Sequence, residues 1–198
     1  SHLINILKRQ KPPDHSRDVS YVPIVSCSIP SRPTQRAMGS ALLRALEYPR
    51  SSTGSADEMF ERVVLQVRAI KTEIIMIDNV HDIPERRSAE GIMHVGNWIR
   101  DLIDRTECLI VMLGTPAARQ ITNANAQLRR RVSKQMVIRY FDIQQQSTAK
   151  IFKRFLFELD KRLPLAQSSQ LDEPKIMQRM YWATAGITDY ILQLVGEA

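Results

Sequence analysis

The chain has 198 residues, 43% of them hydrophobic and 25% charged, the balance of an ordinary globular protein. It has no apolar run of about 18 residues, so we expect no membrane span, and its first residues do not resemble a signal peptide. The net charge of +7 and the pI of 9.7 suit a phosphate-rich partner such as nucleic acid. Cys27 and Cys108 lie in apolar runs, which favours buried thiols in a cytoplasmic protein.

The first part of the chain alternates short apolar runs with amphipathic segments, which predicts strands and helices in turn. In chain order, the pattern predicts helices at 3–8, 37–47, 57–70, 86–104 and from 116, and strands at 22–29, 74–78, 108–113 and 136–141. Strands that alternate with helices of this length indicate a parallel sheet covered by helices on both faces.

After residue 144 the pattern changes to three helical segments, 148–163, 174–184 and 188–195, with no predicted strand between them. We therefore predict two domains. An α/β domain covers 1–145, and a small all-α domain covers 146–198.

The predicted strand at 74–78 reads IIMID and ends in Asp78. A buried strand that ends in a carboxylate is what the Walker B element of a P-loop NTPase requires, because it holds the carboxylate where it can orient the water shell of Mg²⁺. The pattern alone leaves another interpretation open, since Asp also forms turns after core strands.

Two later segments follow in the order that AAA+ proteins have. The next apolar strand ends at Gly114–Thr115, and Thr115 then takes the sensor-1 position, where a polar side chain can contact the attacking water or the terminal phosphate. The segment QLRRRV at 127–132 contains Arg130 and Arg131, candidates for an arginine finger that reaches a neighbouring subunit. The alternative is a solvated or DNA-facing basic patch.

Several segments resemble proteins of the TniB/TnsC kind, which are AAA+ ATPases that assist DNA transposition. The quoted stretches are VPIVSCSIPSRPTQRAMGSALLRALEYP, IIMIDNVHDI, VMLGTPAA, NAQLRRRV, LDKRLPLAQSSQL and TAGITDYILQLV. The resemblance implies a P-loop NTPase fold with a helical lid, ATP and Mg²⁺ as cofactors, and assembly as a homo-oligomer on double-stranded DNA, where a transposase is recruited or activated. It places Asp78, Asn79, Thr115, Arg130 and Arg131 in the catalytic site.

The chain departs from this family at the phosphate-binding loop, since it contains no G-x-x-x-x-G-K-[ST]. It begins with the helix that follows this loop in the family. Ser1 is either the Ser of that motif, and then a Mg²⁺ ligand and part of the nucleotide site, or an arbitrary first residue. We expect the natural protein to extend further upstream, because the sheet needs the strand that leads into the loop.

Two further departures concern catalysis. Asn79 stands where the family usually has Glu, and an amide cannot accept the proton of the attacking water, so hydrolysis should be slower by about 100-fold or more. Asp82 or Glu85 could substitute for the missing carboxylate. The lid segment at 186–189 lacks the sensor-2 Arg of many AAA+ proteins.

Three hypotheses remain at this point: an ATP-dependent DNA-binding regulator of transposition, a degenerate AAA+ adaptor that no longer uses nucleotide, and another AAA+ loader, such as one for a replicative helicase. The sequence therefore leaves open whether the chain hydrolyses ATP. There are two sets of candidate DNA contacts. One is Lys150, Lys153 and Arg154 on a predicted lid helix, and the other is Arg86 and Arg87 at the start of the helix that follows Asp78. Each set is also typical of an ordinary solvated helix face.

Overall fold

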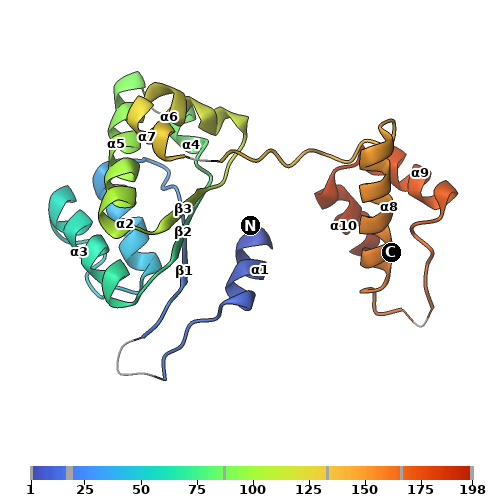
Figure 1. Ribbon diagram of the computed structural model, residues 1–198, viewed down its shortest axis with the longest axis horizontal. Helices are drawn as coiled ribbons and strands as arrows, with labels where there is room; N and C mark the ends of the chain where they lie inside the picture. Colours follow the sequence, from blue (N-terminus) through green and yellow to red (C-terminus); the bar gives the residue numbers. More distant parts are fainter. Residues whose placement is uncertain (1, 17–19, 87, 133, 166, 197–198) are drawn as a thin grey trace. The chain divides into compact units, whose positions relative to one another are not determined.

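A computed structural model describes residues 2–16, 20–86, 88–132, 134–165 and 167–196 of the chain (Figure 1). The chain forms two compact units, Ser1–Gln135 and Met136–Ala198. The first unit contains a parallel sheet with helices, and the described part of the second unit contains helices.

The sheet has three parallel strands in the order β1-β2-β3, namely β1 (Ile24–Ser28), β2 (Ile74–Asp78) and β3 (Leu109–Met112). Ser28 lies opposite Asp78, and Ile77 lies opposite Met112. All three carboxyl ends therefore meet at one edge of the sheet, as expected for a parallel sheet. The α/β class with a parallel sheet is confirmed, and it is consistent with a P-loop-like fold.

The alternation of side chains along the strands separates two apolar clusters, because successive residues point to opposite faces. On one face, strand residues pack with α2 (Gln35–Ala45), α3 (Ala56–Ala69) and α5 (Ala89–Thr106). On the other face they pack with Ile4 and Leu7 of α1 (His2–Gln10). Figure 1 shows α1 on the opposite side of the strands from the other three helices. The first cluster includes Val25, Ile75, Ile77, Ile110 and Met112, and the second includes Ile24, Ile74, Met76, Val111 and Leu113.

The helices of the larger cluster start at side-chain caps. Thr34 accepts a hydrogen bond from the N–H of Ala37 at the start of α2. Ser55 and Glu58 form a capping box at the start of α3, in which each side chain accepts a backbone N–H of the other residue. These bonds satisfy N–H groups that the first turn leaves without a partner. Residues within three positions of each other in the sequence therefore determine where these helices begin.

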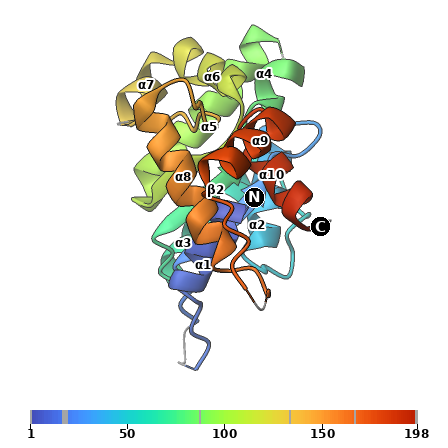
Figure 2. The ribbon, with the colours of Figure 1, turned by 90° about the vertical axis from the view of Figure 1, so that its right-hand side faces the viewer.

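Short helices follow the carboxyl ends of β2 and β3. They are α4 (Asp82–Arg86), the 3-10 turn η1 (Pro116–Ala118), α6 (Arg119–Ala124) and α7 (Ala126–Arg131). Figures 1 and 2 both show α4, α6 and α7 beyond the end of the sheet.

The predicted strand at 136–141 is wrong. This segment pairs with no strand in the described parts of the chain, and its apolar side chains are largely exposed, with Met136 at 76%, Ile138 at 82% and Tyr140 at 68%. β-Branched and aromatic residues favour a strand only where a neighbouring strand offers hydrogen bonds and a surface to pack on. Phe141 instead belongs to the second unit, where its N–H donates to the carbonyl of Gly186 at 3.0 Å.

The second unit contains α8 (Gln146–Asp160), α9 (Pro174–Thr184) and α10 (Thr188–Gly196). Phe152, Leu156, Met180 and Ile191 form its buried core. That 146–198 acts as a lid over a nucleotide stays a prediction. No described helix in either unit combines the length and the apolar character needed to cross a membrane.

Candidate functional site at the carboxyl edge of the sheet

Asp78 ends β2 at the edge where the three carboxyl ends meet. Its carbonyl accepts a hydrogen bond from the N–H of Ile29 at 3.0 Å, so the end of β1 is tied to the end of β2. On the other side, the N–H of Val80 donates to the carbonyl of Leu113 at 2.9 Å. The half-buried Asp78 side chain therefore projects from a backbone that is fixed from both sides.

Asn79 has a backbone role that the sequence interpretation missed. Its φ of 57° lies in the left-handed region, which Asn adopts more readily than most residues other than Gly. Its N–H donates to Oδ1 of Asp78 at 2.9 Å, and its side chain is exposed. Asn79 thus fits the turn that follows β2.

Thr115 lies just past the end of β3 and begins η1. Its carbonyl accepts from the N–H of Ala118 at 3.0 Å, while its side chain forms no capping hydrogen bond with this turn. Thr115 is exposed. The structure therefore places Asp78, at the end of β2, and Thr115, just past the end of β3, at the same edge of the sheet.

Arg131 and Arg130 are in different situations, although they are adjacent on α7. Nε of Arg131 pairs with Asp104 of α5, its Nη2 donates to the same carboxylate at 2.6 Å, and its Nη1 donates to the carbonyl of Gln127 at 3.1 Å. The Arg131 guanidinium lowers the pKa of Asp104 through this hydrogen bond. Arg130 is exposed and forms no hydrogen bond or ion pair with a residue that the structure describes.

Buried Asn125 sets the position of α7. Its side-chain carbonyl accepts the N–H of Leu128 at 2.9 Å, and its amide donates to Oδ1 of Asn97 on α5 at 2.8 Å. Gly96 allows this approach, because a Cβ there would lie 3.2 Å from the Asn125 amide nitrogen. α7 consequently runs beside the later turns of α5.

Arg131 is held by Asp104 in the last turns of α5, whereas Asp78 and Thr115 lie at the carboxyl edge of the sheet. Asp104, which holds Arg131, lies about 22 Å along α5 from the first turn, at 1.5 Å per residue. The end of α5 leads into the amino end of β3, whereas Asp78 and Thr115 lie at the carboxyl ends.

Ser1, the candidate phosphate-loop and Mg²⁺ residue, lies outside the described residues. Among the residues that are described, no three His, Cys, Asp or Glu side chains cluster as a metal site. A single carboxylate is still compatible with Mg²⁺, which often keeps several waters and binds through one or two protein carboxylates and the phosphates of its nucleotide. Asp78 fits that limited role, and the chain has no G-x-x-x-x-G-K-[ST] loop to hold the phosphates.

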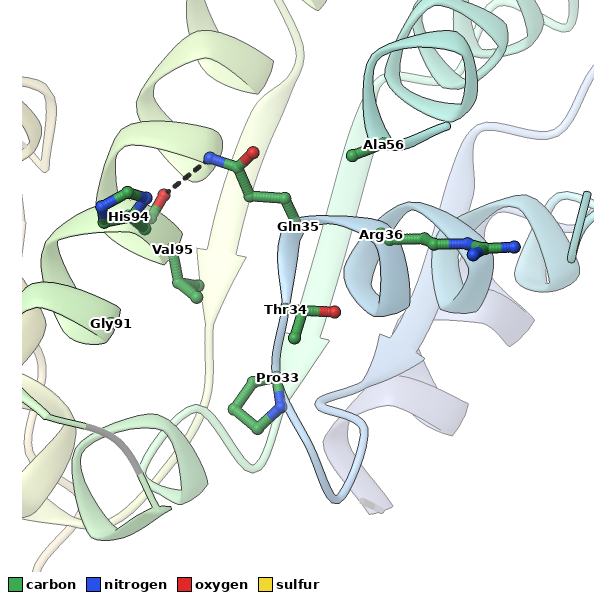
Figure 3. A pocket seen from close by; sticks show the side chains of 8 residues that line it. All are labelled: Pro33, Thr34, Gln35, Arg36, Ala56, Gly91, His94 and Val95. Atoms are coloured by element: carbon green, nitrogen blue, oxygen red, sulfur yellow. Dashed lines mark hydrogen bonds between the residues drawn. The ribbon is translucent and has the colours of Figure 1, made fainter. Parts of the chain in front are cut away.

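A pocket of about 360 Å³ lies at the amino-terminal turns of α2, α3 and α5. Figure 3 shows Gln35 reaching across it to the carbonyl of His94, which accepts a hydrogen bond at 3.4 Å. The residues that line it are Pro33, Thr34, Gln35, Arg36, Ala56, Gly91, His94 and Val95. None of the predicted catalytic residues is among them.

Positive charge is concentrated in the first unit. Residues 1–135 hold 20 of the 28 Lys and Arg residues and 14 of the 21 Asp and Glu residues, so they carry +6 of the formal +7 charge. Lys150, Lys153 and Arg154 are exposed on α8. The side chain of Arg86 and the whole of Arg87 lie outside the described residues.

A scan against family models matches the model described as "Bacterial TniB protein" over residues 1–142. This chain belongs to the TniB family. The match covers the sheet, the strand-end residues and α7, and it ends before α8. TniB membership links the chain to DNA transposition, and it confirms the resemblance noted in the sequence. A search of curated proteins found no match.

Proposed function

We propose that this TniB chain is an ATP-dependent, DNA-binding regulator of transposition. It assembles as an AAA+ homo-oligomer on double-stranded target DNA and recruits or activates a transposase there. The observation that carries the proposal is the placement of Asp78 and Thr115 at one edge of a parallel sheet, within a chain of this family. Ligands of open α/β sheets bind at that edge.

In this proposal the residues at the edge bind and orient the nucleotide. Asp78 holds water molecules of Mg²⁺, and Thr115 offers its hydroxyl to the terminal phosphate or to the attacking water. A bound Mg²⁺ would neutralise charge on the phosphates. The phosphate-binding loop and its strand, with Ser1 as the possible last residue of the motif, complete the site. The helical segment 146–198 is the lid.

Arg130 and Arg131 act on the nucleotide of a neighbouring copy. Arg130 is exposed and therefore available without rearrangement, whereas Arg131 has to exchange its Asp104 carboxylate for a phosphate. Breaking the Arg131–Asp104 ion pair costs little free energy, because both side chains are partly exposed and exposed ion pairs stabilise proteins only weakly. Assembly is thus the step at which the two arginines find their acceptor.

Asn79 makes the protein a slow switch. An amide at this position positions water through hydrogen bonds but does not accept its proton, so the ATP-bound assembly persists. The second candidate, an adaptor that does not use nucleotide, is favoured by the same Asn79 and by the Arg131–Asp104 pair, which already satisfies one candidate arginine.

Assembly of the full-length protein on duplex DNA tests the proposal, measured by sedimentation or electron microscopy with ATP, with ADP and without nucleotide. We expect assembly with ATP only, and its loss in Asp78→Ala and in Arg130→Ala or Arg131→Ala. Asp57→Ala and Arg129→Ala are matched controls, since both residues are exposed. If assembly on DNA needs no nucleotide and is unchanged in all three variants, the protein is an adaptor that does not use nucleotide.

A further inference from the structure

One histidine connects the loop after β2 to the loop after β3. Nδ1 of His81 lies 3.3 Å from the backbone nitrogen of Thr115 and accepts its hydrogen bond. A ring nitrogen accepts only when it carries no proton, so the neutral ring holds its proton on Nε2. Nε2 lies 3.8 Å from the carboxylate oxygen Oδ1 of Asp82. The negative charge of this carboxylate favours a proton on Nε2 over an exposed lone pair.

Gly114 makes this contact possible. A Cβ at position 114 would lie 3.1 Å from both the backbone nitrogen and Nδ1 of His81, and 3.4 Å from the backbone nitrogen of Val80. The two 3.1 Å distances are tighter than ordinary van der Waals contact, and one of these two atoms is backbone. Any larger residue at 114 would therefore push the two loops apart.

The contact continues the connection between β2 and β3 beyond the point where the strands end. The last backbone bonds between these segments are Leu113 N–H to the Ile77 carbonyl at 2.8 Å and Val80 N–H to the Leu113 carbonyl at 2.9 Å. Thr115 lies two residues further on. Its backbone N–H bonds to the His81 ring instead of to another backbone group.

We propose that His81 is a positioning residue for Thr115. By accepting the Thr115 N–H, it fixes the start of η1 against the turn after β2, and so holds the Thr115 hydroxyl at the edge that also bears Asp78. The importance of this position for nucleotide chemistry rests on the proposed function; the connection between the loops does not. His81 itself need not touch the nucleotide.

Nuclear magnetic resonance of the protein tests the connection directly. The ¹⁵N shifts of the His81 ring should show an unprotonated Nδ1 and a protonated Nε2. The exchange rate of the Thr115 amide should rise about tenfold in His81→Leu, which has no acceptor, and return close to the parent value in His81→Asn, whose side-chain oxygen can occupy the Nδ1 position. A protonated Nδ1 in the parent, or equal Thr115 exchange in the parent and His81→Leu, overturns the proposal.

His94→Leu is the matched control, because His94 is an exposed histidine on α5 whose ring lies near Glu90 and not near Thr115. It should leave the exchange of Thr115 unchanged. If His81→Leu does not fold, Gly114→Ala reaches the same contact from the other loop and leaves the histidine in place. It should also speed Thr115 exchange about tenfold, and unchanged exchange in this variant refutes the proposal.

Nucleotide hydrolysis by the full-length protein separates this proposal from the proposed function. If Thr115 is positioned for the reaction, His81→Leu lowers kcat about tenfold with little change in KM, and His81→Asn restores most of it. Absence of any nucleotide hydrolysis in the parent counts against the proposed function, while the exchange data alone still decide the His81 connection. An unchanged kcat despite faster Thr115 exchange refutes the positioning role.

Discussion

Gly186 lies between α9 and α10 and contacts Phe141, which precedes α8. Its replacement by Ala should destabilise the helical unit and leave the stability of the sheet unit unchanged. Its φ is +70°, a conformation that costs a residue with a Cβ about 1 kcal/mol. The added Cβ would lie 2.1 Å from the carbonyl oxygen of Phe141 and 2.9 Å from its carbonyl carbon, so the backbone has to move. That movement breaks the Phe141 N–H bond to the Gly186 carbonyl, which contributes about 1 kcal/mol.

The displaced Phe141 also loses aromatic contacts. Its ring centroid lies 4.9 Å from that of Phe152 and 5.0 Å from that of Phe155, and such pairs contribute about 0.5–1.5 kcal/mol each. Together these losses come to at least about 3 kcal/mol, a factor of roughly one hundred or more in the unfolding equilibrium. We therefore expect the helical unit to lose most of its stability while the sheet unit keeps its own.

Hydrogen–deuterium exchange with mass spectrometry measures the two units separately in the intact chain. In Gly186→Ala, peptides from α8, α9 and α10 should exchange about a hundredfold faster, and those from β1, β2 and β3 should not change. Gly196→Ala is the matched control, because a Cβ there meets no atom within 4 Å. If the helical peptides of the two variants exchange at the same rate, the Phe141–Gly186 contact does not stabilise the unit and our reasoning is wrong.

Three further predictions follow from single residues. Asn79→Glu should raise ATP hydrolysis by the full-length protein about a hundredfold, because it restores a proton acceptor; phosphate release that stays at the parent rate would show that the missing carboxylate does not limit turnover. Burial raises the pKa of Cys27 from 9.0 to about 12, which leaves roughly a thousandfold less thiolate, so iodoacetamide at pH 8 should alkylate Cys27 far more slowly in the native protein than in urea, as mass spectrometry can determine. Asp160 accepts hydrogen bonds from the Ser168 hydroxyl and from the N–H groups of Ser169 and Gln170, which lower its pKa below 3.8. Its stabilising effect is complete above pH 3.8 and is lost as the pH falls through the lowered pKa, and Asp160→Asn should remove this part of the acid sensitivity in a thermal unfolding series.

The sequence was sufficient to predict the three strands that form the sheet and the edge at which Asp78 and Thr115 lie. Each strand of the sheet is a short apolar run, and helices begin next to capping residues such as Ser55 and Thr34. These signals are local, so they can be recognised without knowing what each segment packs against. Because parallel strands bring their carboxyl ends together, Asp78 and the residues after β3 could be placed at one edge from the order of elements alone.

The tertiary structure decided the features that depend on distant partners. Residues 136–141 have the composition of a strand, yet no described strand pairs with them, and a ladder needs a partner that composition does not encode. The distinction between Arg130 and Arg131 comes from Asp104, which follows from where α5 and α7 pack.

The contact of His81 with Thr115 has the same origin. It joins residues that lie 34 positions apart in the chain, and it needs Gly114 to leave room for the ring. Residue type and spacing predict which groups the chain offers at the edge of the sheet. Which of these groups bond to one another is decided when the strands and helices pack, because hydrogen bonds depend on distances and directions that the order of residues does not contain.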